Sequence, residues 1–362
     1  MYELILGSFF LAGILGFALI PPVRKLAVAK DLVAKPNHRT SHTGRIPNIG
    51  GVAIFSAFIL AFLFVSAQTD GKAQYIGFIA LGMFLIGLYD DVMVISPKLK
   101  LGLEALIVLL PVCVGDFRLT HLHGFFGINE LNYIWGVLLT TFVIIVIINA
   151  VNLIDGIDGL AAGVGMVVSL FFGIYFALNG EMMYLVLSFC LLGALLPFFG
   201  YNVFSRNKKI FMGDSGSLVI GALIAVLTIK FNEINIASAS PYRIINVPMV
   251  SICVLVLPMF DTLRVFVIRA MQGKSPFLAD KNHLHHMFLS LGFNHKQSTG
   301  IMLTISVAYI FAGLLLQNTS KTFFFLTVIV SCVVWSEIVR LTIKTREKDR
   351  EKKVKPIFSE IM

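Results

Sequence analysis

The chain has little charge for its length. Only 14% of its 362 residues are Asp, Glu, Lys or Arg, whereas 57% are hydrophobic, and the mean hydropathy is +0.87. Soluble domains carry about 25% charged residues. The composition therefore excludes an ordinary soluble globular protein and predicts an all-α polytopic membrane protein.

Cysteine is also scarce. Each of the four cysteines lies inside an apolar run, and no two of them form a CxxC pair: Cys113, Cys190, Cys253 and Cys332. A zinc site or a disulfide framework would need clustered or regularly spaced cysteines. We expect these side chains to pack in the interior instead.

Separate soluble domains and processing signals are lacking as well. No segment outside the apolar runs is long and mixed enough to fold alone, and no internal repeat of fixed period occurs. The first apolar run has no basic segment before it and no small-residue cleavage site after it, so we expect a retained helix. We predict one integral-membrane domain over residues 1–343 and a charged tail over residues 344–362.

Long apolar runs dominate what is present. Eleven of them are candidates for membrane spans, which need about twenty residues each. The third and fourth runs are short. The runs lie near residues 3–22, 49–66, 75–89, 101–115, 133–151, 160–178, 181–200, 215–231, 245–268, 300–317 and 321–340.

The basic residues predict the orientation. Of the 29 Lys and Arg residues, 24 fall in alternate connections on one side or in the tail; the other five are Lys72, Arg118, Lys230, Arg243 and Lys321. This asymmetry places the N-terminus outside and the C-terminus in the cytoplasm. The net charge of +9 is then a topology signal that also suits anionic lipid headgroups. We expect no nucleic-acid partner.

One acidic stretch lies between two apolar runs. Asn149, Asn152, Asp155 and Asp158 repeat every three residues, so a helix end or tight turn would place all four side chains on one side. Ionised groups at a membrane surface are costly unless cations, metal or water neutralise them. The pattern favours a functional site over an ordinary polar turn.

Two further acidic motifs end or open apolar runs. Asp90 and Asp91 end the third run, where adjacent like charges raise each other's proton affinity and one carboxylate can act as a base. Asp214 opens the eighth run after a glycine, which suits a phosphate near a helix N-terminus and a hard cation on the carboxylate. The alternatives are a charged helix end and a plain helix cap.

A histidine cluster lies in the long connection before the tenth run. No cysteine or fixed fourth ligand accompanies it, whereas Arg269 and Lys281 share the connection, so a cationic phosphate-binding loop fits better than a zinc site. The cluster consists of His283, His285 and His286. His121 and His123 form a similar pair, but they fall on the predicted external side, and we expect no site there.

The motifs together resemble a known family. In order they are the basic loop from Lys35 to Gly51, Asp90-Asp91, the stretch from Asn149 to Leu160, the segment from Phe211 to Ser217, and the His-Leu-His-His cluster. This order resembles the polyprenyl-phosphate N-acetylhexosamine-1-phosphate transferases over most of the chain. The chain departs at Ala34, where many members carry Asp before Lys-Pro.

Two details relate to branches of that family. The His-x-His-His form, preceded by Ser275-Pro276-Phe277, is similar to the undecaprenyl-phosphate N-acetylglucosaminyl-1-phosphate transferases. Relatives that start peptidoglycan with a muramoyl-pentapeptide usually carry three successive histidines. That activity remains the alternative within the family.

The resemblance implies a reaction and a place. N-acetylhexosamine-1-phosphate, with GlcNAc-1-phosphate expected, would pass from a UDP-N-acetylhexosamine to undecaprenyl phosphate with release of UMP. It would be the first membrane step of cell-envelope polysaccharide synthesis, at the cytoplasmic face of the bacterial inner membrane. Mg²⁺ is the implied cofactor, with Mn²⁺ as the alternative, because two anions must meet. The lipid bilayer is a partner, and homodimer formation is left open.

The resemblance also implies residue roles. Asp214 would ligate the metal, with Asn152 or Asp155 as the second ligand. Asp90 would take the proton from the lipid phosphate with support from Asp91. The remaining roles are uracil binding by Asp158 and Phe211, and contact with the pyrophosphate and sugar by Arg269, His283, His285 and His286.

Two other classes of membrane protein share single features with this chain. CDP-alcohol phosphotransferases share Asp-Gly near a membrane surface, but the Arg and the later acid pair of their motif are missing here. Transporters usually place ionisable residues near the bilayer midplane in repeated halves, whereas this chain has no internal repeat.

The ninth run, with Pro248 and Pro258, predicts a kinked helix that lines a groove for the lipid tail. We expect Glu104 and Glu337 to snorkel or to pair structurally.

Overall fold

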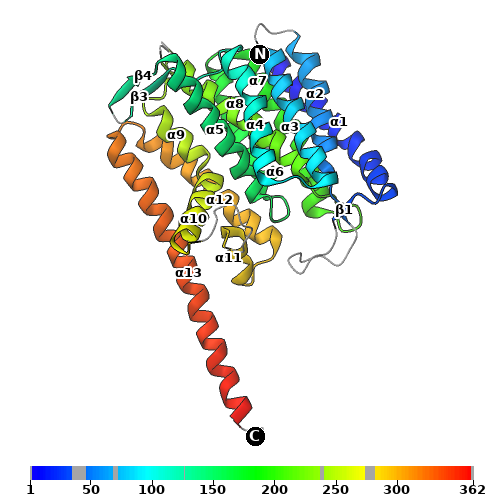
Figure 1. The fold of residues 1–362 in the computed structure, drawn as a ribbon, viewed down its shortest axis with the longest axis vertical. Coiled ribbons are helices and arrows are strands. Elements are labelled where there is room, and N and C mark those ends of the chain that lie inside the picture. The colour runs from blue at the N-terminus through cyan, green and yellow to red at the C-terminus, as the bar shows by residue number, and fades with distance from the viewer. Residues whose placement is uncertain are drawn as a thin grey trace.

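All eleven apolar runs are α-helical in the computed structural model of the chain (Figure 1). It describes residues 2–34, 46–67, 72–125, 127–236, 240–273 and 282–359, without the side chains of residues 349–359. Residues 35–45 of the predicted basic loop and residues 274–281 therefore lie outside the description. The helices are α1 (Tyr2–Ala29), α2 (Gly50–Ser66), α3 (Ala73–Met93), α4 (Pro97–Cys113), α5 (Tyr133–Ile154), α6 (Leu160–Leu178), α7 (Met182–Phe199), α8 (Asp214–Ile234), α9 (Val247–Val254), α10 (Val256–Met271), α11 (Leu284–Ser290), α12 (His295–Leu316) and α13 (Lys321–Ser359).

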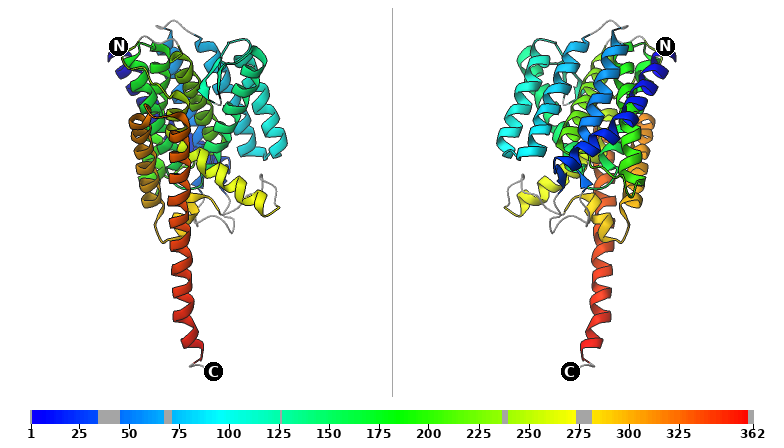
Figure 2. Two further views of the ribbon diagram at one scale, coloured as in Figure 1. Left: turned by 90° about the vertical axis from the view of Figure 1, so that its left-hand side faces the viewer. Right: turned by 90° about the vertical axis from the view of Figure 1, so that its right-hand side faces the viewer.

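Two short hairpins and one π-helical turn complete the described elements. Strands β1 (Val33–Ala34) and β2 (Ile46–Pro47) pair antiparallel, as do β3 (His121–Phe125) and β4 (Ile128–Glu130). A π-helix, Gly200–Phe204, extends α7. In Figure 1 the β3–β4 hairpin and α11 lie toward opposite ends of the bundle. Figure 2 shows α13 continuing as a single helix well beyond the other helices, across the predicted boundary at residue 343.

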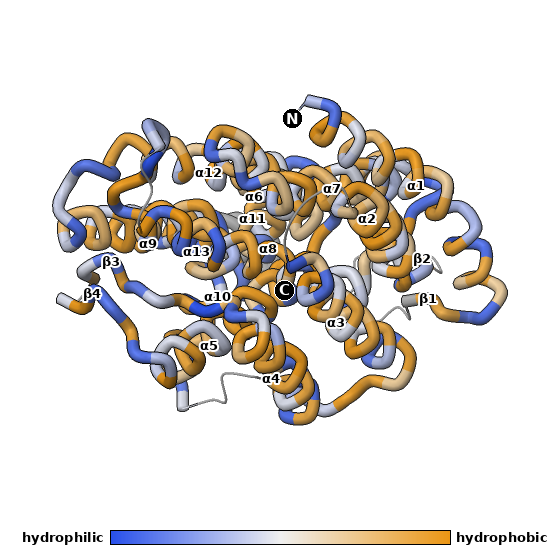
Figure 3. Tube along the Cα trace, turned by 90° about the horizontal axis from the view of Figure 1, so that it is seen from above, coloured by the Kyte–Doolittle hydropathy of each residue, from blue (hydrophilic) through white to orange (hydrophobic). Residues whose placement is uncertain are grey.

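The predicted class, an all-α polytopic membrane protein, is confirmed. Among the described residues, eight helices are long and apolar enough to cross a membrane, and the bent pair α9–α10 adds a ninth if it forms one span. Seen from above, hydrophobic residues continue out to the periphery of the bundle (Figure 3). Large apolar side chains such as Phe64, Phe142 and Leu315 are exposed there. The count of eleven spans and the orientation stay predictions, since α2 is a shorter apolar helix.

Helix α8 forms the centre of the bundle. Nearly all of its residues are buried, and it packs against α2, α3, α5, α6 and α7. Aliphatic residues and Phe231 fill this interface, and Phe231 lies edge-on to Tyr175 with 4.7 Å between ring centroids. Because α8 touches so many neighbours, the position of its first residue is fixed relative to most of the molecule.

Local sequence accounts for several helix starts. Ser96 caps α4 ahead of Pro97, which suits the first turn because it needs no amide donor there. Asn132 caps α5 through the Trp135 amide, which donates to its side chain at 3.0 Å. A capping box, Asn294 with Gln297, opens α12.

The ninth apolar run is broken, as predicted. α9 and α10 meet at an angle of 80° around Leu255. Pro258 lies in the first turn of α10 and cannot donate to the carbonyl of Val254, which favours a kink or a break of the helix at this point. Pro248 lies in the first turn of α9, where proline is tolerated. The lipid-lining role of this bend stays a prediction.

One sequence expectation needs correction. Cys190, Cys253 and Cys332 are buried, but Cys113 is exposed because it ends α4 at the periphery. Of the two outcomes expected for Glu104, the structure shows the structural pairing: its side chain is fully buried and accepts a hydrogen bond from Asn149 Nδ2 at 2.7 Å. The expected pairing of Glu337 with Arg340 is present at 2.5 Å.

The start of α2 contacts the start of α8 directly. The amides of Gly50 and Gly51 donate to the carbonyls of Phe211 and Met212 at 2.8 and 2.7 Å, and the Phe211 amide donates to the Pro47 carbonyl at 2.8 Å. A Cβ atom on Gly51 would lie 2.1 Å from the backbone nitrogen of Gly216. Only glycine permits this approach.

Substituting Gly51→Ala should therefore destabilise the fold. The methyl group meets backbone that cannot rotate away, and overpacking of this kind costs about 1–3 kcal/mol. Thermal unfolding in detergent measures the loss, with Gly7→Ala as the matched control because nothing lies within 4 Å of a Cβ there. Equal transition temperatures for the two variants would contradict the packing account.

Candidate functional site

A cavity of about 900 Å³ lies at the α11 end of the bundle. The ends of α3 and α5, the start of α8 and residues from α11 and α12 surround it. Eight residues singled out from sequence line it: Asp90, Asp91, Asn152, Asp155, Asp158, Phe211, Asp214 and His286. The acidic motifs, which are far apart in the sequence, thus lie together at one end of the bundle.

Asp91 caps α8 from another helix. One of its carboxylate oxygens accepts from the Asp214 amide at 2.7 Å, and the other accepts from the Ser215 amide at 3.0 Å. The helix has no side-chain cap of its own, because Gly213 precedes it. An acid at this place also complements the helix dipole. Asp91 therefore positions Asp214.

Lys100 joins two of the acids. Its ammonium lies 2.9 Å from Asp90 Oδ2 and 3.1 Å from Asp214 Oδ2, and the Ile95 amide also donates to Asp90. Sequence reasoning missed this lysine. The available signal was its place in the first turn of α4, ten residues after Asp90 across a short connection.

The regular spacing of the acidic stretch does not put every side chain in the cavity. Asn152 Nδ2 donates to Asp214 Oδ1 at 2.5 Å and to Ser217 Oγ at 2.8 Å. Asn149 instead reaches Glu104 between α4 and α5. The expectation of one shared face was therefore wrong for Asn149, because three residues along a helix leave its side chain about 60° off the direction of Asn152, and it faces α4.

Asp155 follows the last residue of α5 and faces the cavity. Burial raises the pKa of its carboxyl to about 7, and the nearby charges of Asp214, Asp91 and Asp158 add to this effect. Among the described residues no cation pairs with it. Asp155 is thus the acid at which the negative charge of the cavity is least compensated.

Asp158 is in the opposite situation. Its carboxylate lies 2.6 Å from Lys209 Nζ and 3.1 Å from His295 Nδ1. Burial alone would raise its pKa, but hydrogen bonds from His295 and Lys209 hold the pKa below its usual range. Lys209 also lies 5.4 Å from the ring centroid of Phe211. Lys209 thus links the two residues to which the resemblance assigned uracil binding. Neither Lys209 nor His295 was singled out from sequence.

Hydrogen bonds and close packing hold His283 and His285 of the histidine cluster in place. His283 Nδ1 lies 2.9 Å from the fully buried Asp261, which also accepts from the Leu284 amide. A Cβ atom on Gly156 would lie 2.2 Å from His285 Nε2, so the imidazole packs directly against the acidic turn. Burial holds the pKa of His285 well below its usual value. Burial therefore favours the neutral form of this imidazole.

Among the described members of the predicted cationic cluster, only one reaches the cavity wall. His286 lines it, whereas Arg269, His283 and His285 do not belong to the lining and are buried. His121 and His123 lie on the β3–β4 hairpin at the other end of the bundle, as expected.

A metal would find hard oxygen donors here. Within the described residues, no three His, Cys, Asp or Glu side chains come close enough to hold an ion by themselves. Mg²⁺ usually takes only one or two carboxylates and completes its shell with water and substrate phosphates. Asp214, Asn152 and the poorly compensated Asp155 fit such an open site.

Known proteins resemble the chain over the same elements. Residues 73–232 match the family model described as glycosyl transferase family 4. An undecaprenyl-phosphate alpha-N-acetylglucosaminyl 1-phosphate transferase of Yersinia pestis is 31% identical, over 79% of this chain and 76% of the relative. The chain belongs to glycosyl transferase family 4. Proteins of the same name from Escherichia coli K12 and Haemophilus influenzae are 29% and 32% identical over 79% and 85% of this chain and over 76% and 86% of their own lengths.

The region matched by the family model holds most of the cavity wall. It runs from α3 to near the end of α8 and so includes the five acids together with Lys100 and Lys209. His286 and His295 lie beyond it. In this family 4 chain, residues outside the matched region therefore form the imidazole side of the cavity.

Neutralising Asp155 should stabilise the metal-free protein at alkaline pH. The folded chain keeps the Asp155 proton up to about pH 7, whereas an unfolded chain releases it near 3.8, so this group costs stability as the pH rises through that window. Asp155→Asn should raise stability by roughly 1–3 kcal/mol at pH 8 and by little at pH 4. Unfolding in EDTA-containing buffer at both pH values measures the difference; a gain that does not change with pH would contradict the assignment.

Proposed function

We propose that the chain transfers N-acetylglucosamine-1-phosphate from UDP-N-acetylglucosamine to undecaprenyl phosphate and releases UMP. The observation that carries the proposal is the cavity at one end of a membrane bundle, where five carboxylates stand beside two lysines and two imidazoles. The names of the family 4 relatives support the choice of sugar and lipid. They do not favour the muramoyl-pentapeptide alternative.

The reaction exchanges one phosphoryl bond for another. An oxygen of the lipid phosphate forms a bond to the β-phosphorus of UDP-N-acetylglucosamine, and the bond from that phosphorus to the oxygen of UMP breaks. Asp90 is the acceptor for a proton on the lipid phosphate. Lys100 lies beside Asp90 and would hold the attacking phosphate by its charge.

The metal assignment follows from the donor set. We propose Mg²⁺ on Asp214 with Asn152 or Asp155, where it would neutralise charge on the pyrophosphate. Asp91 contributes by holding the first turn of α8, and with it Asp214, in place. The carboxylate of Asp214 is already oriented by Asn152 and Lys100.

The nucleotide end of the cavity has an aromatic ring and a fixed acid. We assign the uracil to Phe211, by stacking, and to Asp158, by hydrogen bonding. Lys209 and His295 hold the Asp158 carboxylate ionised. His286 also lines the cavity and would donate to the sugar or the pyrophosphate.

The orientation completes the proposal. Connections at the cavity end carry most of the Lys and Arg residues, so this end would face the cytoplasm of a bacterial inner membrane. UDP-sugars are made in that compartment, and the apolar flanks of the bundle give undecaprenyl phosphate access from the bilayer. The synthesis of cell-envelope polysaccharide is the process this step would begin.

The deciding experiment offers purified protein undecaprenyl phosphate and Mg²⁺ with a panel of UDP-sugars. UDP-N-acetylglucosamine should give the fastest UMP release, and Asp214→Asn should abolish it while the protein remains folded. Release from UDP-N-acetylmuramoyl-pentapeptide alone would establish the alternative activity. Absence of UMP with every donor would refute a transferase.

The lysine bridge makes a separate prediction. Lys100→Met should lower kcat by about 10²–10³-fold, because it removes a charge that faces the reacting phosphates. Lys98→Met, two residues away on an exposed position, is the matched control and should retain wild-type turnover. UMP release over a range of undecaprenyl phosphate concentrations separates kcat from KM. Comparable rates for the two variants would remove Lys100 from the site.

A further inference from the structure

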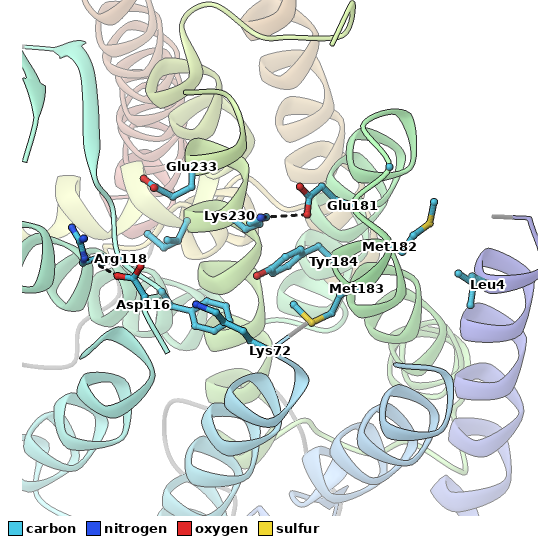
Figure 4. Close-up of a pocket in the computed structure, with 13 residues that line it drawn as sticks. Leu4, Lys72, Asp116, Arg118, Glu181, Met182, Met183, Tyr184, Lys230 and Glu233 are labelled. Carbon is cyan, nitrogen blue, oxygen red and sulfur yellow. Dashed lines mark hydrogen bonds and ion pairs between the residues drawn. The ribbon is translucent and has the colours of Figure 1, made fainter. Parts of the chain in front are cut away.

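A second polar cavity lies at the end of the bundle opposite the acidic one (Figure 4). It has a volume of about 660 Å³ and lies where α7 begins and α8 ends, next to the starts of α1 and α3. Only five Lys or Arg residues occur in the connections at this end, and three of them line this cavity: Lys72, Arg118 and Lys230.

Three acids balance these cations. Lys230 Nζ lies 3.3 Å from Glu181 Oε2, and Arg118 Nε lies 2.8 Å from Asp116 Oδ1. The third acid is Glu233. The lining is therefore neutral overall although it is strongly polar, unlike the acidic cavity at the other end.

One cation and one acid of the lining have no ionic partner among the described residues. Lys72 Nζ donates to the Gly115 carbonyl and lies 5.7 Å from the ring centroid of Phe117. Glu233 accepts from the Thr120 amide and hydroxyl, both at 2.8 Å. Figure 4 shows Lys72 and Glu233 at separate places on the cavity wall.

Structural tethering explains only part of this arrangement. The two ion pairs, Lys230–Glu181 and Arg118–Asp116, can hold the connections against the helix ends. Lys72 and Glu233 present opposite charges that a ligand with both signs would complement. A purely anionic ligand would meet three carboxylates, and burying charge beside like charge is unfavourable.

The edge of the cavity suggests where such a ligand comes from. Leu4 on α1 and Met182 and Met183 on α7 form an apolar side beside the charged groups (Figure 4). α1 lies at the periphery, with large apolar side chains such as Phe10 and Phe17 exposed. A molecule that moves from this apolar side toward Lys72 and Glu233 passes from an apolar surface to a polar one.

We propose that this cavity binds the headgroup of a zwitterionic phospholipid from the leaflet at that end. The phosphate lies at Lys72, and the ammonium lies at Glu233. Because the cavity is at the opposite end from the acidic site, the proposal does not depend on the transferase activity.

Native mass spectrometry of the purified protein tests the proposal with phosphatidylethanolamine and phosphatidylglycerol. The wild-type protein should retain the zwitterionic lipid at lower lipid concentration than the anionic one. Lys72→Ala should weaken retention of phosphatidylethanolamine about tenfold, since a hydrogen bond to a charged group is lost. Lys72→Arg should restore it, which separates charge from folding.

Two further variants sharpen the result. Glu233→Gln removes the charge while its amide oxygen can still accept from the Thr120 amide and its NH2 group can donate to the Thr120 hydroxyl, so it should weaken phosphatidylethanolamine and not phosphatidylglycerol. Arg243→Ala changes an exposed cation at the same end that does not line the cavity, and it should have no effect. Equal retention of both lipids by the wild-type protein, or unchanged retention in Lys72→Ala, would overturn the proposal. Binding of soluble phosphoethanolamine as tightly as the lipid would overturn the assignment to the bilayer.

Discussion

Repulsion among carboxylates is the constraint that the acidic end of this bundle must satisfy. Five of them line one cavity: Asp90, Asp91, Asp155, Asp158 and Asp214. Four of them are compensated in three ways: Lys100 pairs with Asp90 and Asp214, backbone amides of α8 donate to Asp91, and Lys209 with His295 pairs with Asp158. Asp155 has no such partner among the described residues, and its pKa rises accordingly. Groups held this way cluster at functional sites because the fold alone gains little from them.

The same compensation fixes the geometry. Asp91 belongs to α3, and the amides it accepts from open α8, so the contact that relieves its charge also sets the register between those helices. Gly51 brings α2 against the same turn, and Asn152 brings α5 there. The start of the most buried helix is thereby held by three others. A carboxylate at that position can move little, as preorganised catalysis requires.

The sequence was sufficient for the helices and for most of the acids. Apolar runs specify membrane helices because lipid requires each backbone group to pair within its own segment, and even the bend at Pro258 follows from local chemistry. The cations were missed because Lys100, Lys209 and His295 resemble the other basic residues near helix ends, and the choice of partner is tertiary. Asp261 was overlooked and Asn149 was misjudged for the same reason, since spacing along a helix does not reveal which neighbouring helix a side chain faces.

Charge balance also bears on how the acidic cavity could accept its proposed substrates. Both a UDP-sugar and a lipid phosphate are anions, yet five carboxylates and two imidazoles line the described wall, and only two lysines pair with those acids. Bringing two more anions there would be strongly unfavourable without additional positive charge. A divalent ion on the Asp214 side would supply part of it, and it would lower the proton affinity of Asp155 at the same time. The excess negative charge of the cavity would therefore be neutralised by the cations that accompany the substrates.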